Sequence, residues 1–391
     1  MITIRRQLLG LGFVAASSLL ALHSAHAMTG PTAITIDGGP IGSLSLSGGV
    51  NGYGWYANQQ TPNNNSEGVD VGSALIELQK TTGVVQFTIE VGSIGGAVTL
   101  GTTPTETSVS FYRTGPLYLG YITIAPPNSP VTVSAGQLPS LEGYEASTPW
   151  SNPSQLTTSL FYVQNSSAVG VQAVLTEGPV TATAQFGDGF DTGVWNYAQG
   201  LVSYAIDSNN VANIYGAINL GRTGPGAFAY GGGTAGTGNA YLNDEMIGGY
   251  YSWTSGNLNL VPEIQYTYAK ANALAGVVPS YYPDGSVDFK STSNFGAALF
   301  ATYAFANTPY SIGGWAEYEN SQGNYDWFVG PGSEAMGAAV SPTWQYKDLY
   351  ARANAGAIYL LNNKQFSTAS YGSNGTNKVQ FLGTLEAGLL F

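Results

Sequence analysis

Residues 259–268 read Asn-Leu-Val-Pro-Glu-Ile-Gln-Tyr-Thr-Tyr, and their side chains alternate between two chemical classes. One parity is mainly apolar or aromatic and contains Leu260, Ile264, Tyr266 and Tyr268, whereas the other is mainly polar and contains Asn259, Glu263, Gln265 and Thr267. A period of two residues predicts a β-strand with one apolar and one polar face.

The same alternation recurs along the chain, for example at residues 85–91, 311–320 and 380–391. No stretch beyond residue 28 approaches the roughly 18 consecutive apolar residues that a membrane helix needs. The sequence therefore predicts an all-β protein built from many amphipathic strands.

Short and long connections alternate between these strands. Turn-forming residues mark seven short connections at 81–83, 128–130, 177–179, 208–210, 255–257, 307–309 and 347–348. Eight longer polar stretches lie between them, at 58–69, 95–115, 139–155, 188–194, 222–240, 272–290, 321–333 and 363–377. This order is typical of an antiparallel up-and-down barrel with short turns on one rim and long loops on the other. We predict about 16 strands, with both chain ends at the short-turn rim; an error of one hairpin gives 14 or 18.

The composition favours a transmembrane barrel over a soluble one. Only 9% of the 391 residues are charged, against about 25% in soluble domains, and mean hydropathy is only +0.02. The polar faces carry mostly Ser, Thr, Asn, Gln and Gly. Apolar faces often end in aromatics such as Tyr53, Tyr250, Tyr266 and Tyr303, which we expect to form girdles at the lipid interfaces. A secreted soluble β-sandwich is the alternative, and it would purify without detergent.

The first 27 residues have the features of a cleaved export signal. Arg5 and Arg6 precede a short apolar run over residues 8–22, and Ala25-His26-Ala27 is a small-x-small cleavage site. We therefore expect a signal peptide at 1–27, a short lead-in at 28–41 and a single barrel at 42–391.

Removal of this signal makes the chain strongly acidic. Nine Lys and Arg then face 23 Asp and Glu, a net charge of −14, and His23 and His26 leave with the signal. Nucleic acid is a poor partner for such a chain, because its phosphates need a basic patch. Histidine catalysis, His-ligated zinc and Cys-based sites are also excluded, so we expect no enzyme activity and no cofactor.

Two segments resemble the OmpL-like beta-barrel porins of Gram-negative outer membranes. One runs from Ala125-Pro126 through the strand 131–137 into Leu-Pro-Ser-Leu-Glu-Gly-Tyr-Glu at 138–145. The other runs from Leu-Phe-Tyr at 160–162 through Ala-Val-Gly-Val at 168–171 to Phe-Gly-Asp-Gly-Phe-Asp at 186–191. Gln137 stands where the family usually has Lys, and the arginine that commonly opens the returning strand is missing near Ser159. Both departures remove positive charge from the pore mouth that the resemblance implies.

The last residue carries a second resemblance. Phe391 follows a stretch of alternating apolar residues, which is similar to the terminal signature of outer-membrane barrels. That similarity implies recognition of Phe391 by the outer-membrane assembly machinery.

Inward-facing carboxylates are the main candidates for function. By parity, six acids occupy polar strand faces: Glu77, Glu90, Glu263, Glu317, Glu319 and Glu386. We predict that they line the pore together with Arg352, since a charge on the lipid side of a barrel is unfavourable. Each acid could instead be a wall residue paired with Arg352 or Lys80. As a set, six acids facing two bases predict a negative field along the pore.

The polar stretch 139–155 is the candidate constriction loop, with Glu142 and Glu145 as its charged residues. In general porins a long early loop folds into the lumen. The alternative is an external loop that only covers the rim.

These observations predict an outer-membrane porin for passive diffusion of small hydrophilic solutes and ions, with a preference for cations. Expected partners are outer-membrane lipid and lipopolysaccharide, the assembly machinery and the permeating solutes, and a homotrimer is possible. The alternative is an outer-membrane barrel whose long loops carry a binding or enzymatic role.

Overall fold

The computed structural model describes residues 28–60, 65–102, 116–221, 223, 228–229, 233–234, 241–272, 279–281, 287–323, 334–362 and 371–391. Almost all regular structure in these residues is β-strand. None of the helices in these ranges is long and apolar enough to cross a membrane.

Sixteen strands form one closed antiparallel barrel, as predicted. In order around the ring these are β2 (Ser43–Ala57), β3 (Glu67–Lys80), β4 (Val85–Ser93), β6 (Leu117–Ile124), β7 (Val131–Pro139), β9 (Ser167–Glu177), β10 (Val180–Gly187), β11 (Tyr197–Asp207), β12 (Asn210–Asn219), β15 (Asp244–Ser255), β16 (Leu258–Ala269), β19 (Thr292–Ala304), β20 (Tyr310–Gln322), β21 (Glu334–Tyr346), β22 (Leu349–Asn362) and β23 (Val379–Leu390). The ring closes between its first and last strands, from Gly49 opposite Leu390 to Ala57 opposite Leu382.

Several short elements are not members of this ring of strands. β1 (Ile34–Asp37) precedes the barrel and pairs with the first residues of β2. The remaining elements belong to the long connections: β5 (Val98–Thr99), η3 (Pro149–Ser151), β8 (Leu156–Thr157), α2 (Ser159–Tyr162), β13 (Phe228–Ala229), β14 (Gly233–Thr234), η4 (Tyr241–Asn243), β17 (Pro279–Tyr281) and β18 (Val287–Phe289). The lead-in also holds the short turn η2 (Gly39–Ile41).

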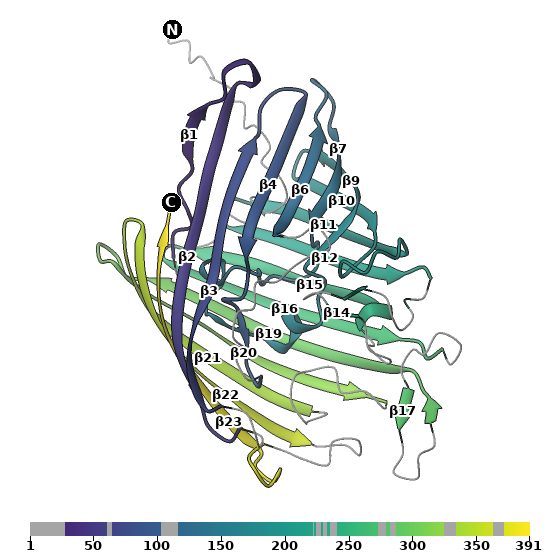
Figure 1. Ribbon diagram of the computed structural model, residues 1–391, viewed down its shortest axis with the longest axis vertical. Helices are drawn as coiled ribbons and strands as arrows, with labels where there is room; N and C mark the ends of the chain where they lie inside the picture. Colours follow the sequence, from purple (N-terminus) through teal and green to yellow (C-terminus); the bar gives the residue numbers. More distant parts are fainter. Residues whose placement is uncertain are drawn as a thin grey trace.

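The predicted alternation of short and long connections is confirmed. All seven predicted turns join neighbouring strands, and the eight long stretches fall, along the sequence, between successive strand pairs. Both ends of the barrel meet at the short-turn rim, where the Gly48 amide donates to the Phe391 carbonyl at 2.8 Å. Figure 1 shows the chain end beside the first strands, with the strands tilted across the barrel.

The two faces of each strand divide as the alternation predicted. Outward side chains form a broad apolar surface, and Ile264 on β16 is 59% exposed while the adjacent Gln265 is 2% exposed. The aromatic girdle prediction is wrong for Tyr53 and Tyr250, which are buried among the inward side chains, whereas Tyr266 is outward. Aromatic residues occur on both parities of this barrel, so their identity alone did not indicate the face.

Candidate functional site: the inward loop and the barrel wall

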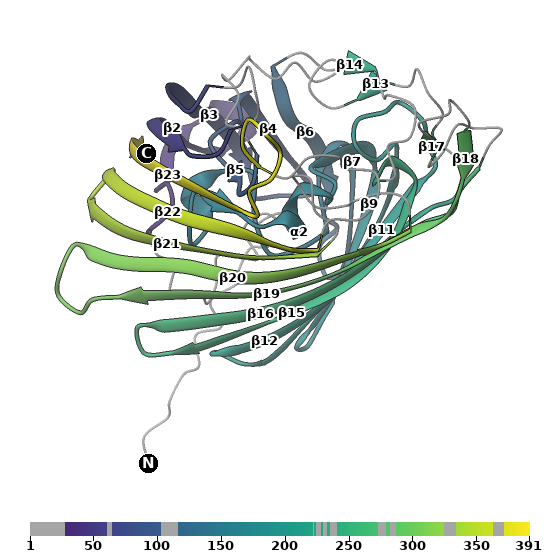
Figure 2. The same ribbon diagram turned by 90° about the horizontal axis from the view of Figure 1, so that it is seen from below.

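The connection between β7 and β9 folds into the barrel. We call residues 140–166 the inward loop; they contain η3, β8 and α2. Figure 2 shows α2 and β5 inside the ring of strands. The loop makes hydrogen bonds to wall strands that lie some 200 residues further along the sequence, so it spans the interior.

A second segment from another long connection joins the inward loop. β5 pairs in parallel with β8, placing Val98 opposite Leu156 and Thr99 opposite Thr157. The Val98 amide donates to the Gln155 carbonyl at 3.0 Å. Two connections thus form one body inside the barrel.

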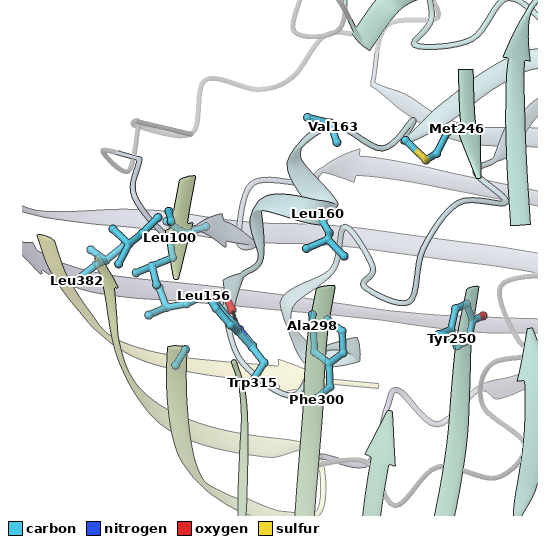
Figure 3. Close-up of a cluster of buried hydrophobic side chains, with 14 of the residues drawn as sticks. Leu100, Leu156, Leu160, Val163, Met246, Tyr250, Ala298, Phe300, Trp315 and Leu382 are labelled. Carbon is cyan, nitrogen blue, oxygen red and sulfur yellow. Dashed lines mark hydrogen bonds between the residues drawn. The ribbon is translucent and has the colours of Figure 1, made fainter. Parts of the chain in front are cut away.

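An apolar cluster fixes this body against the wall. Leu100, Leu156 and Leu160 come from the two interior segments, and Phe300 and Trp315 come from β19 and β20; all five are at most 4% exposed. Figure 3 shows these side chains converging between the interior segments and the wall. Burial of large apolar side chains supplies about 1.5–3 kcal/mol each, so the loop is held by packing as well as by hydrogen bonds.

Arg352 on β22 anchors the inward loop to the wall. Its guanidinium donates to the Asn152 carbonyl at 3.0 Å and to the Pro149 carbonyl at 2.8 Å. On its other side it forms an ion pair with Glu386 on β23. Both side chains are fully buried, so the fork geometry of arginine joins the loop backbone to a wall carboxylate.

Three further wall residues form hydrogen bonds with the backbone of the loop. Ser159 donates its amide to the Glu317 carboxylate at 2.7 Å, and Trp315 donates its indole N–H to the Leu156 carbonyl at 2.6 Å. Asn354 accepts from the Gln155 amide at 3.1 Å. These bonds satisfy loop backbone groups that would otherwise be buried without partners.

The wall needs a glycine where Pro153 of the loop lies against β20. A Cβ added to Gly313 on β20 would lie 2.0 Å from the Pro153 carbonyl oxygen. No side chain fits in that space, so Gly313 permits the backbone of the loop to rest on the strand.

The structure divides the predicted pore-lining acids into two groups. Four of them are between 1% and 4% exposed and accept hydrogen bonds: Glu263 from Tyr215, Glu317 from Ser159, Glu319 from Asn294, and Glu386 from Arg352, Asn51 and Tyr350. Glu77 and Glu90 are only half-buried. A pore-lining role for any of these acids, or for Arg352, remains a prediction.

Glu142 and Glu145 lie in the interior within the inward loop. Glu142 accepts from the Tyr197 hydroxyl at 2.9 Å and from the Asn165 amide at 2.7 Å. Burial raises its pKa to about 7, although these hydrogen bonds oppose the shift. Glu145 accepts from the Thr158 amide at 3.0 Å, and burial raises the pKa of its carboxyl well above the usual value. Glu145 stabilises the loop's own fold, and Glu142 also joins the loop to β11 through Tyr197.

Lys80 is not the inward base that we expected. Gln79 is the inward residue at that end of β3, and the Lys80 amino group donates to the Thr82 and Val85 carbonyls of the adjoining turn. Sequence reasoning also missed Trp315, which shares the parity of Glu317 and Glu319 and could have been placed inward on that basis.

No group of three or more His, Asp or Glu side chains in the described ranges could hold a metal ion. The interior is instead a polar wall crossed by a packed loop. Such an arrangement can narrow a passage and present fixed charges to it.

Comparison with known proteins identifies the family. The family described as Putative beta-barrel porin-2, OmpL-like, matches residues 43–391. The chain belongs to this family. Membership in these OmpL-like porins makes it an outer-membrane β-barrel of the porin kind, and the predicted family resemblance is confirmed.

Solved porin structures share the fold of this OmpL-like barrel. An anion-selective porin from Comamonas acidovorans matches with TM-score 0.55 and 12% identity, covering 89% of this chain and 99% of that one. OmpT of Vibrio cholerae, folded in vitro, matches with TM-score 0.54 and 9% identity, covering 90% and 98%. OmpF of Salmonella typhi, in complex with daunomycin, matches with TM-score 0.54 and 12% identity, covering 92% and 100%. None of the curated proteins matches the sequence.

Proposed function

We propose that this OmpL-like barrel is an outer-membrane porin through which small hydrophilic solutes and ions, preferentially cations, diffuse passively. One observation carries the proposal: a closed sixteen-stranded barrel whose polar inner wall is crossed by an anchored loop. Family membership over residues 43–391 supports it. No chemical transformation and no cofactor are part of this function.

The inward loop sets the size limit in this proposal. It bonds to wall strands on several sides of the ring, including β6 and β11 as well as β16 and β23. In this proposal a solute passes beside the loop or after the loop has moved. Polar wall groups replace part of the solute's hydration shell along the way.

The charge of the interior gives the expected sign of selectivity. Among the residues that the structure describes, acids outnumber bases on the inner wall, since Lys80 turns away and Arg352 is already paired with Glu386. Low-dielectric surroundings focus the field of a few charges in a narrow passage. Cations are therefore concentrated in the lumen and anions are depleted.

Export and assembly follow the usual route for such barrels in this proposal. The signal peptide at 1–27 is cleaved, Phe391 is read by the assembly machinery, and the barrel contacts outer-membrane lipid and lipopolysaccharide. One structure of Vibrio cholerae OmpT is described as a trimer form and matches this chain with TM-score 0.52 and 9% identity. A homotrimer is accordingly the assembly that we propose.

Planar-bilayer recording tests the function directly. Purified, refolded protein should produce discrete conductance steps in a KCl gradient, with a zero-current potential of the sign expected for cation preference. A folded barrel that inserts but never conducts would refute the porin proposal. Conductance with anion preference would refute only the proposed selectivity.

A further inference from the structure

The first described residue of the chain packs inside the barrel. Met28 is 3% exposed and belongs to a buried apolar cluster of wall and interior side chains. This cluster also contains Leu390 on β23, Tyr350 on β22 and Trp150 of the inward loop. Met28 directly follows the proposed cleavage site after Ala27. In our proposal the mature chain therefore begins within the lumen.

The next residue is bound to the inner wall near the short-turn rim. The Thr29 amide donates to Gln345 Oε1 at 2.7 Å, and the Thr29 carbonyl accepts from Gln345 Nε2 at 2.9 Å. Gln345 shares its parity on β21 with Ser341 and Thr343, which are buried and inward. It lies two residues before the short turn 347–348. One side-chain amide thus holds both backbone groups of Thr29 on the inside of the barrel.

The other end of this segment is attached to the opposite side of the seam, where β2 pairs with β23. β1 pairs with residues 43–46 of β2, and two of these residues also pair with β3 on their other edge. β1 therefore occupies the edge of β2 on which β23 pairs from Gly49 onward. Figure 1 shows β1 beside the start of β2.

The segment is long enough to cross from this edge to β21. The five residue steps from Thr29 to Ile34 reach up to about 17 Å when extended. Two inter-strand spacings of about 4.8 Å each separate β21 from the edge that β1 shares with β23. Residues 28–33 therefore cross the inside of the last strands, next to the seam.

The cluster that receives Met28 also holds one end of the inward loop. A Cβ added to Gly49 on β2 would lie 3.0 Å from Trp150 Cη2 and 2.8 Å from Leu390 Cδ2, so the Trp150 ring lies against the seam. The adjacent Pro149 carbonyl accepts from Arg352 at 2.8 Å. Withdrawal of Met28 would expose this apolar cluster to water, which is unfavourable.

The crossing segment itself has few buried groups. Residues 29–33 are exposed or half-buried, in contrast to Met28. Segments with few buried apolar contacts and solvent-exposed backbone open at low free-energy cost. The segment can therefore leave the inner wall while the sixteen strands stay paired.

We infer that residues 28–33 form an internal latch at the short-turn mouth of the channel. The docked latch narrows this mouth on the seam side and keeps Trp150 in place, and release of Met28 and Thr29 widens the passage. The effect on permeation rests on the proposed porin function. The binding partner of the latch is the chain's own inner wall, at Gln345 and the cluster around Leu390.

Methionine oxidation tests whether the latch is docked. In T32M protein purified from outer membranes, dilute peroxide should convert the exposed methionine at position 32 to its sulfoxide much faster than the buried Met28. Mass spectrometry compares the two sites within one peptide. Adding Q345A removes both hydrogen bonds of Thr29 and should speed oxidation of Met28 by about fivefold to thirtyfold, with no change at position 32. Equal oxidation of the two sites in T32M overturns the latch.

Single-channel recording tests the effect of the latch on permeation. The unaltered protein should alternate between a smaller and a larger conductance level, and Q345A should raise the ratio of time in the larger level by the same fivefold to thirtyfold. Deletion of residues 28–33 leaves β1 intact and should give the larger level only. The control is T32A, which alters an exposed residue of the segment and should behave as the unaltered protein.

The outcomes separate the latch from the function on which it rests. If the unaltered protein and the deletion variant both insert without conducting, the porin proposal fails, and the oxidation experiment still decides whether the segment docks. If both conduct with identical levels and dwell times, the latch does not control the mouth and the inference is overturned. If the deletion variant fails to assemble, Q345A decides, and unchanged dwell times in Q345A overturn the inference.

Discussion

At the scale of single residues, the same amino acid has different surroundings at different points of the inner wall. Parity alone places Glu317 inward, but its burial depends on Ser159 of the inward loop. Glu90 is also inward by parity, but no residue of the inward loop bonds to it. Sequence therefore predicted the side of the sheet for each acid, and could not predict which acids the loop would cover, because the loop's path depends on tertiary contacts.

Glu142 should make docking of the inward loop depend on pH. Its usual pKa of 4.5 is raised to about 7 by burial, so the docked loop binds the proton more tightly than an undocked loop does. This contribution to docking is complete below about pH 4.5 and is lost as pH rises through about 7. Single-channel recordings across this range should show longer or larger openings at higher pH.

The variant Glu142→Gln should flatten that pH profile, because an amide has no proton to lose. Glu145, whose pKa is also raised by burial, shifts the profile in the same direction, so E142Q/E145Q should flatten it further. A profile that survives both substitutions would assign the titration to other groups, such as Asp244, which also accepts from the Tyr197 hydroxyl.

At the scale of elements, strands and loop differ in how far the sequence defines them. Each strand carries its own period of two, which predicts its existence and its faces without knowledge of its neighbours. The inward loop has no such period. Its position depends on Arg352, Trp315 and Asn354, which lie far along the chain. The sequence therefore left two alternatives for residues 139–155, a loop inside the lumen and a loop that covers the rim.

Adjacent residues of β11 test the assignment of faces. Val202 is 47% exposed on the outer side, and Ser203 is an inward residue that donates to Asn213 at 2.6 Å. Val202→Arg should impair insertion, at a cost of about 2–4 kcal/mol near the bilayer midplane, while Ser203→Arg should assemble. Heat-modifiable mobility of the membrane fraction on gels gives the folded yield. Equal yields for the two variants would contradict the lipid-facing assignment.

Arg352 and Glu386 test the anchoring of the inward loop. R352Q/E386Q removes the buried ion pair without leaving an unpaired charge and deletes charge-assisted bonds to two loop carbonyls, each worth about 1.5–3 kcal/mol. We expect a folded barrel with larger or noisier conductance. R352Q alone leaves Glu386 buried without its cation and should lose roughly 3–5 kcal/mol of stability. A folded double variant with unaltered conductance would mean that the anchor does not position the loop.

At the scale of the whole molecule, closure depends on a seam between the first and last strands. The alternation of turns and loops predicted an even number of strands with both ends on one rim, because each hairpin returns the chain to its starting side. The predicted number of strands could be wrong by one hairpin, since strand ends are poorly defined by sequence. The pairing of β2 with β23 selects sixteen.

Phe391 should contribute to closure of this seam. Its amide and carbonyl exchange hydrogen bonds with Gly48, at 3.0 Å and 2.8 Å. Deletion of Phe391 removes both bonds along with the terminal aromatic ring and should lower the folded yield in the outer membrane. Phe391→Tyr keeps the backbone bonds and an aromatic ring and serves as the control. Protease resistance of the membrane fraction measures both, and a full yield after deletion would assign closure to the remaining pairs.

The long reach of the inward loop has a consequence for the order in which the chain folds. Gln155 bonds to Asn354 and Thr384, 199 and 229 residues away in sequence. Contacts between such distant segments form slowly, because the chain must first close a large loop. The inward loop, which is encoded in the first half of the chain, can thus reach its final position only after the last strands have formed. In a newly exported chain, the inward loop therefore lacks its hydrogen-bond partners until the last strands have arrived. During this time the loop needs protection from aggregation.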